Sequence, residues 1–146
     1  MNESEKDKML DAAYATFEIE AESLRATGEV LDRTEFEKAV DMLASAERIA
    51  ASGCGHSGIA CRHFAHLCCC IERPARFLSP SEAVHGGLGY ICPGDVMMLA
   101  SRGGETDELV PIAKICRAKG ASVILVTEKP DSTLGRLSDI ILRIAV

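Results

Sequence analysis

Ser122-Val123-Ile124-Leu125-Val126-Thr127 is the stretch that decides the fold of this 146-residue chain. Its four central residues are apolar and mostly β-branched, a pattern typical of a strand that is buried on both faces. Gly120 precedes it, where a glycine commonly ends a helix. Pro130, Asp131 and Ser132 follow as a turn with a helix cap. This succession predicts a parallel strand between two helices.

The same alternation extends through the chain on both sides of that strand. Four further short apolar runs are predicted as strands, at 48–53, 76–78, 95–100 and 140–145. Helical patterns separate them at 57–71, at 106–119 and near Thr133. The sequence therefore predicts a doubly wound α/β fold, with five parallel strands, right-handed crossovers and flanking helices.

Two helices are predicted ahead of the sheet. The first covers about residues 4–27 and ends at Gly28; the second begins at Thr34, which forms a capping box with Glu37. The first carries one apolar stripe at spacings of four and three residues, made by Leu10, Tyr14, Phe17, Ala21 and Leu24. We therefore divide the chain into a helical lead-in, residues 1–46, and an α/β domain, residues 47–146.

The chain ends just after the fifth predicted strand, with no helix to cover it. Two explanations are open: the domain continues beyond residue 146, or a partner subunit covers the exposed face.

Composition narrows the classes of function. The chain is 47% hydrophobic and 26% charged, with a formal net charge of -6. These are values of a folded globular domain, and the acidic balance argues against nucleic acid or an anionic membrane as a partner. No apolar stretch approaches the roughly 20 residues of a membrane span. Seven cysteines without a secretory signal indicate reduced thiols in the cytoplasm.

The first loop that carries chemistry follows the first predicted strand and reads Gly53-Cys54-Gly55-His56-Ser57-Gly58. Its glycines let the backbone approach a ligand, and the helix that follows offers unpaired N–H groups, so the loop suits an anion. Two alternatives remain. The loop also matches a dinucleotide fingerprint, which requires an acidic residue after the second strand where this chain has Leu78-Ser79-Pro80. It could also be a tight turn without a ligand.

Two more loops follow strands at the same predicted edge. Residues 101–108, Ser-Arg-Gly-Gly-Glu-Thr-Asp-Glu, combine hydroxyls, glycines and a cation in Arg102 that suits phosphate. Their acidic residues either complement the helix dipole or include a general base. The other loop, residues 79–89, contains His85, which is either structural or part of an active site. We expect no cofactor and no structural zinc site, since Cys61, His63 and His66 do not share a helix face; a single metal ion at His85 remains open.

Together these loops resemble the sugar isomerase (SIS) domain family, and within it the arabinose-5-phosphate isomerases without CBS domains. The family pattern Gly-x-Gly-Lys-Ser-Gly corresponds to residues 53–58, and Pro-x-Glu-Ala-x-His-Gly-Asp-Leu-Gly to residues 80–89. Ser-Asn-Ser-Gly-Glu-Thr-x-Glu corresponds to residues 101–108, and Pro-Asp-Ser-x-Leu to residues 130–134. The resemblance implies a flavodoxin-like SIS fold, a homodimer or homotetramer, and aldose–ketose isomerisation of a sugar phosphate.

The resemblance also implies roles for individual residues. Glu108 would be the catalytic carboxylate, assisted by His85 and His56, and the phosphate would be held by Gly55, Ser57, Ser101, Arg102, Gly103 and Thr106. The chain departs from the family pattern at His56 (lysine in the family), Arg102 (asparagine), Gly103 (serine) and Gly87 (aspartate). Two hypotheses follow: an arabinose-5-phosphate isomerase-like enzyme, or a module that binds or senses a sugar phosphate without converting it.

Overall fold

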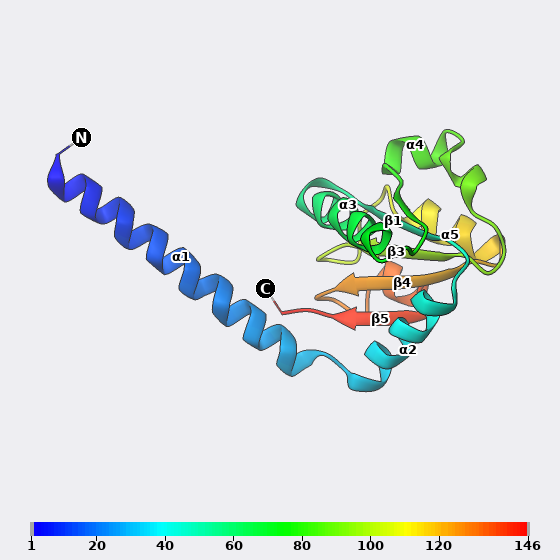
Figure 1. The fold of residues 1–146 in the computed structure, drawn as a ribbon, viewed down its shortest axis with the longest axis horizontal. Coiled ribbons are helices and arrows are strands. Elements are labelled where there is room, and N and C mark those ends of the chain that lie inside the picture. Colours follow the sequence, from blue (N-terminus) through cyan, green and yellow to red (C-terminus); the bar gives the residue numbers. More distant parts are fainter. Residues whose placement is uncertain (1, 146) are drawn as a thin grey trace.

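The computed structural model describes residues 2–145 and contains one parallel sheet (Figure 1). Five strands lie in the order β2-β1-β3-β4-β5, and every neighbouring pair is parallel. Their bounds are β1 Ile49–Gly53, β2 Ala75–Phe77, β3 Val96–Ala100, β4 Ser122–Thr127 and β5 Ile140–Arg143. The prediction of a doubly wound, five-stranded parallel sheet is confirmed.

Helices cover both faces of the sheet. Their bounds are α1 Glu3–Val30, α2 Arg33–Ser45, α3 Gly55–Cys70, α4 Pro80–Val84, the 3-10 helix η1 Gly87–Tyr90, α5 Val110–Ala118 and α6 Thr133–Arg136. Successive residues of β3 point to opposite faces, as the pleat requires. Met97 and Leu99 pack with α5 and α6, whereas Val96 and Met98 pack with α2 and α3. Each face therefore has its own apolar core.

α2 belongs to the second of these cores. Its Ala39 is 1% exposed and clusters with Ile140 of β5, so α2 covers one face of the last strand. From the sequence we expected a missing helix or a partner subunit at this position, and on this face the chain supplies the cover from its N-terminal segment.

α1 differs from every other helix. It extends away from the body of the molecule over its whole length (Figure 1), and none of its described residues is buried. Its base is attached through Thr27, whose Oγ1 donates to the carbonyl of Ala145 at 3.0 Å and accepts from its N–H at 3.1 Å. Among residues 2–145, no helix is both long enough and apolar enough to cross a membrane.

Two predicted helix ends near the N-terminus were wrong. Gly28 does not end α1, because it keeps a negative φ and the helix continues to Val30. Thr34 does not begin α2, because the Asp32 side chain two residues earlier accepts from the N–H of Glu35 at 2.9 Å and is itself a good N-cap.

The predicted start of α5 was also wrong. Thr106 lies in a turn that precedes the helix, and α5 begins at Val110, with Pro111 in its first turn where proline is favoured. Glu105, Asp107 and Glu108 therefore precede the helix instead of forming its first turn. At the end of the sheet, β5 stops at Arg143, two residues before the predicted boundary.

Candidate functional site

The site lies where the direction of winding reverses. From β1 the chain moves outward to β2, then returns to place β3 on the other side of β1. The loops that leave the carboxyl ends of β1 and β3 therefore diverge and leave a crevice between them. Ligands of open parallel sheets bind at such a crevice.

The loop after β1 brings strand and helix unusually close together. A Cβ on Gly58 would lie 2.5 Å from the carbonyl oxygen of Gly53, and one on Gly53 would lie 2.9 Å from the backbone of Ser57. Both positions therefore require glycine. Gly55 has φ +54° and opens α3. This geometry places the N-terminal N–H groups of a 16-residue helix at the crevice, where they favour negative charge.

The loop after β3 is fixed by its own side chains. Ser101 Oγ and Thr106 Oγ1 are hydrogen-bonded at 2.7 Å, and Ser101 Oγ also accepts from the N–H of Gly104 at 3.1 Å. The carbonyl of Gly104 accepts from the N–H of Leu134, at the start of α6, at 3.0 Å. These bonds hold the loop rigidly against the neighbouring helix.

A second link joins the same loop to α6. Glu105 Oε1 accepts from the N–H of Thr133 at 2.7 Å, and hydrogen bonds with the Thr133 side chain and backbone hold the pKa of Glu105 below its usual value. The carboxylate of Glu105 is therefore a structural group of this loop.

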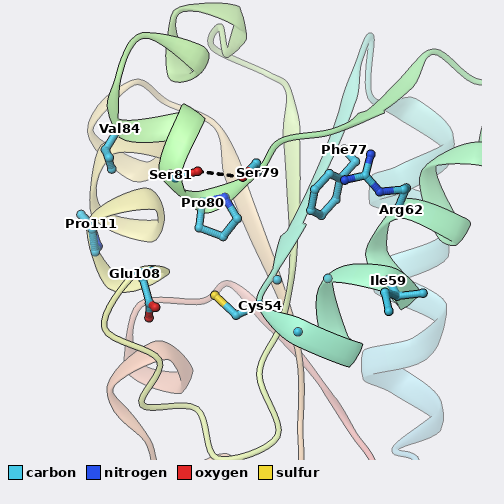
Figure 2. A pocket seen from close by; sticks show the side chains of 13 residues that line it. Cys54, Ile59, Arg62, Phe77, Ser79, Pro80, Ser81, Val84, Glu108 and Pro111 are labelled. Carbon is cyan, nitrogen blue, oxygen red and sulfur yellow. Dashed lines mark hydrogen bonds between the residues drawn. The ribbon is translucent and has the colours of Figure 1, made fainter.

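An open pocket of about 540 Å³ lies beside the α3 N-terminus. Figure 2 shows Glu108 and Cys54 on one side of it, with Arg62 and Phe77 on the other. The pocket is lined by Gly53, Cys54, Gly55, Gly58, Ile59, Arg62, Phe77, Ser79, Pro80, Ser81, Val84, Glu108 and Pro111.

Glu108 is placed by the residue that follows it. Leu109 is fully buried in the core, and its N–H donates to the carbonyl of Thr106 at 3.0 Å. This turn directs the exposed Glu108 to the pocket (Figure 2). Burial, followed by the negative charge of Glu108, raises the pKa of the Cys54 thiol. Cys54 therefore presents a neutral S–H to the pocket.

The predicted site residues are divided between this pocket and its surroundings. Gly55 and Glu108 line it, whereas six others lie on the two loops without lining it: His56, Ser57, Ser101, Arg102, Gly103 and Thr106. His85 caps α4 and is exposed outside the lining. Arg102 Nε binds Glu128 Oε2 at 2.9 Å, which lowers the pKa of Glu128.

Sequence reasoning missed the wall opposite Glu108. Ile59 and Arg62 of α3 and Phe77 of β2 form it (Figure 2). Gly55, Ile59 and Arg62 follow one another at helical spacings of four and three, so they share one face. That spacing, which starts at the glycine loop, is the signal that could have placed Ile59 and Arg62 on the same face as the loop; no such signal exists for Phe77.

From the sequence we expected no structural zinc site among the histidines and cysteines and left open a single metal ion at His85. Within the described residues, no group of three or more His, Cys, Asp or Glu side chains is arranged to hold a metal ion. His66 Nε2 and Cys70 Sγ on α3 do approach each other, at 3.7 Å. All seven cysteines are free thiols.

A glycine loop at a helix start, a hydroxyl loop beside it and a carboxylate across an open pocket define a doubly wound α/β domain with a crevice suited to an anion. Residues 42–146 match the family model of the SIS domain. The chain belongs to the SIS domain family.

Relatives of known sequence support this assignment. The chain is 33% identical over 141 residues to arabinose 5-phosphate isomerase GutQ of Salmonella typhi, covering 96% of this chain and 44% of that protein. It spans about two fifths of the length of the curated relatives it matches.

Solved structures agree with the fold. A proposed sugar-phosphate isomerase of Listeria monocytogenes superposes with a TM-score of 0.93 at 38% identity, over 100% of this chain and 75% of that one. Escherichia coli CFT073 c3406 in complex with arabinose 5-phosphate gives 0.81 at 30% identity, over 100% and 76%. The sugar isomerase domain of an RpiR transcription factor from Sphaerobacter thermophilus gives 0.83 at 19% identity, over 91% and 75%, which is a likeness of fold alone.

Proposed function

We propose that this chain binds a sugar phosphate and interconverts its aldose and ketose forms, as an arabinose-5-phosphate isomerase does. One observation carries the proposal: the Glu108 carboxylate faces a pocket that begins at the glycine-lined N-terminus of α3. A base and an anion-binding helix end are the two groups that this reaction requires. The relatives named for this activity support the same assignment.

The reaction assigns a separate task to each part of the site. The phosphate dianion is bound by the N–H groups around Gly55 and Ser57, together with the loop that contains Ser101, Arg102, Gly103 and Thr106. Glu108 removes the proton from C2 of the open-chain aldose. An enediol forms when the C1 oxygen takes up a proton. Glu108 then returns the abstracted proton to C1 while the C2 hydroxyl gives up its proton, which yields the ketose.

Two further groups assist this proton transfer. His56 and His85 assist ring opening and the movement of protons between oxygens.

The test is turnover of arabinose 5-phosphate to its ketose by the wild-type chain. We expect Glu108→Gln to lose at least about 100-fold in kcat, the range typical for removal of a general base, while still binding substrate. Asp107→Asn is the matched control, because Asp107 is the neighbouring carboxylate and does not line the pocket. Full activity of Glu108→Gln would exclude Glu108 as the base.

A second candidate function is a binding module without turnover. His56 favours it, because it replaces a permanently charged family lysine with a side chain that is mostly neutral at pH 7. Under this alternative, arabinose 5-phosphate or fructose 6-phosphate raises the melting temperature of the protein, yet neither is converted.

We further propose that α1 pairs with α1 of a second copy, as part of a homodimer or homotetramer. Its apolar stripe repeats at alternating spacings of four and three residues, which is the seam of a two-helix coiled coil. Phe17 and Leu24 on this seam are 66% and 74% exposed, and a helix in a protein gains most of its stability from packing of its apolar face.

Phe17→Glu tests this pairing. We expect it to shift the protein from dimer or tetramer to monomer in analytical ultracentrifugation. Ile19→Glu is the matched control, since Ile19 is equally exposed at 66% but lies off the seam. A monomeric wild-type chain, or equal effects of the two variants, would refute the pairing.

We also propose a cytoplasmic location, supported by seven cysteines that are all free thiols. Fractionation of cells that produce the protein checks this, and recovery outside the cytoplasm would contradict it.

A further inference from the structure

Arg62 is the cation of the pocket that the proposed reaction does not use. It projects from α3, two turns after the glycine loop, and its guanidinium stacks on the Phe77 ring at 4.3 Å from the centroid. Within residues 2–145, this stack is its sole recorded polar or ring contact, and the side chain is exposed. Its N–H groups are therefore available to a ligand.

The stack prepares the guanidinium for binding. The ring restricts the long, flexible side chain, and a planar guanidinium binds a carboxylate or phosphate through two parallel hydrogen bonds. Phe77 and Arg62 both line the pocket. Arg62 is also the one cation among the described lining residues, while Glu108 is the one carboxylate.

Arg62 and the helix start lie at different ends of the pocket. The backbone positions of Gly55 and Arg62 are about 10 Å apart along the axis of α3, and the Arg62 side chain leans back from there onto Phe77, so its guanidinium lies closer to the helix start than this. Figure 2 shows Arg62 across the pocket from Glu108 and Cys54. An open-chain pentose or hexose phosphate is long enough to reach from the helix start to this guanidinium.

We propose that Arg62 is a second anion-binding position and that the pocket favours sugar phosphates with an acid group at the opposite end of the chain. The ligand places its phosphate at the α3 N-terminus and its second acid group on the Arg62 guanidinium. The inference rests on the sugar-phosphate binding proposed above and extends the ligands of this pocket to phosphorylated sugar acids and sugar bisphosphates. Such ligands carry their acid group where an aldose carries its C1 aldehyde, so they occupy the pocket without being isomerised.

The test compares two ligands that differ only at one end. 6-Phosphogluconate carries a carboxylate where glucitol 6-phosphate carries a hydroxymethyl group. Calorimetry on the full chain should give at least ten-fold tighter binding of 6-phosphogluconate. Arg62→Gln should remove this preference and leave the Kd of glucitol 6-phosphate unchanged within two-fold.

Arg76→Gln is the matched control. Arg76 is also exposed and stacks on an aromatic ring, Tyr90, at 4.9 Å, but it does not line the pocket. It should keep the full preference. Arg62→Lys, which keeps the charge but loses the planar fork, should retain part of it.

Three results overturn the inference. They are equal wild-type affinities for the two ligands, a preference that persists in Arg62→Gln, and an Arg62→Gln variant that loses both ligands equally. The last result would mean that Arg62 binds the phosphate. If arabinose 5-phosphate, glucitol 6-phosphate and 6-phosphogluconate all fail to bind the wild type, the proposed function itself is wrong, and this inference with it.

Discussion

Replacing Gly104 with alanine should destabilise the protein, because the backbone and its surroundings both require glycine there. Gly104 has φ +68°, a left-handed conformation that costs an alanine about 1 kcal/mol. A Cβ at this position would lie 1.9 Å from Ser132 Oγ and 2.4 Å from Ser132 Cβ. Ser132 would therefore have to move.

Movement of Ser132 would break a hydrogen bond and lower the stability of the protein. It is 2% exposed, and its Oγ accepts from the N–H of Gly135 at 3.1 Å as the N-cap of α6. Loss of an N-cap costs about 1 kcal/mol. With the backbone strain, Gly104→Ala should lower the free energy of unfolding by about 2–3 kcal/mol, or roughly 4–12 °C in melting temperature for a domain of this size.

The assay is urea unfolding followed by circular dichroism, at one protein concentration for all variants. Gly103→Ala is the control on the adjacent residue, because no atom lies within 4 Å of its added Cβ and its φ is not positive. It should change stability by less than about 0.5 kcal/mol.

A double mutant separates the two costs at Gly104. In a Ser132→Gly background, the same alanine should cost only the strain, about 1 kcal/mol. Equal stabilities of Gly104→Ala and Gly103→Ala, or an equal cost of Gly104→Ala in both backgrounds, would refute this explanation.

Further predictions concern buried polar groups. Asp95 is 1% exposed and accepts from Arg48 Nε, from a terminal nitrogen of the same guanidinium and from the N–H of Cys92. Asp95→Ala should therefore cost about 2–3 kcal/mol in urea unfolding, whereas Glu22→Ala, which breaks an exposed pair with Arg25, should change nothing measurable. Burial raises the pKa of the Cys61 thiol to about 11. At about pH 8 Cys61 should react with a disulfide reagent only after urea is added. The unfolded chain releases the Cys61 proton at its ordinary pKa, whereas the native chain keeps it up to about 11. Stability should therefore fall as pH rises from about 9 to 11, with a smaller slope in Cys61→Ala.

The sheet could be predicted because its signal is local. Four consecutive apolar residues from Val123 to Val126 require a strand that is covered on both faces of the sheet. The helix and turn signals beside this strand show that a helix precedes it and another follows it. The start of α5 could not be predicted in the same way. Thr106 is a plausible helix cap by type, but its hydroxyl bonds to Ser101 instead, which is a contact within the folded loop.

The candidate site could likewise be predicted only in part. Gly55 and Glu108 could be predicted to meet, because loops after neighbouring parallel strands share one edge of the sheet. The wall formed by Arg62 and Phe77 depends on β2 lying beside β1 and on a side chain crossing between helix and strand. Neither fact is visible in residue spacing alone.

The bond between Ser101 and Thr106 has a consequence for selectivity. Their bond uses one of the two hydroxyl protons and leaves the other free, so an incoming acceptor can bind here without breaking it. An anionic acceptor would form a charge-assisted bond, roughly twice as strong as a bond to a neutral oxygen. We therefore expect a loop arranged in this way to prefer charged acceptors over uncharged ones, before any other part of the molecule is recognised.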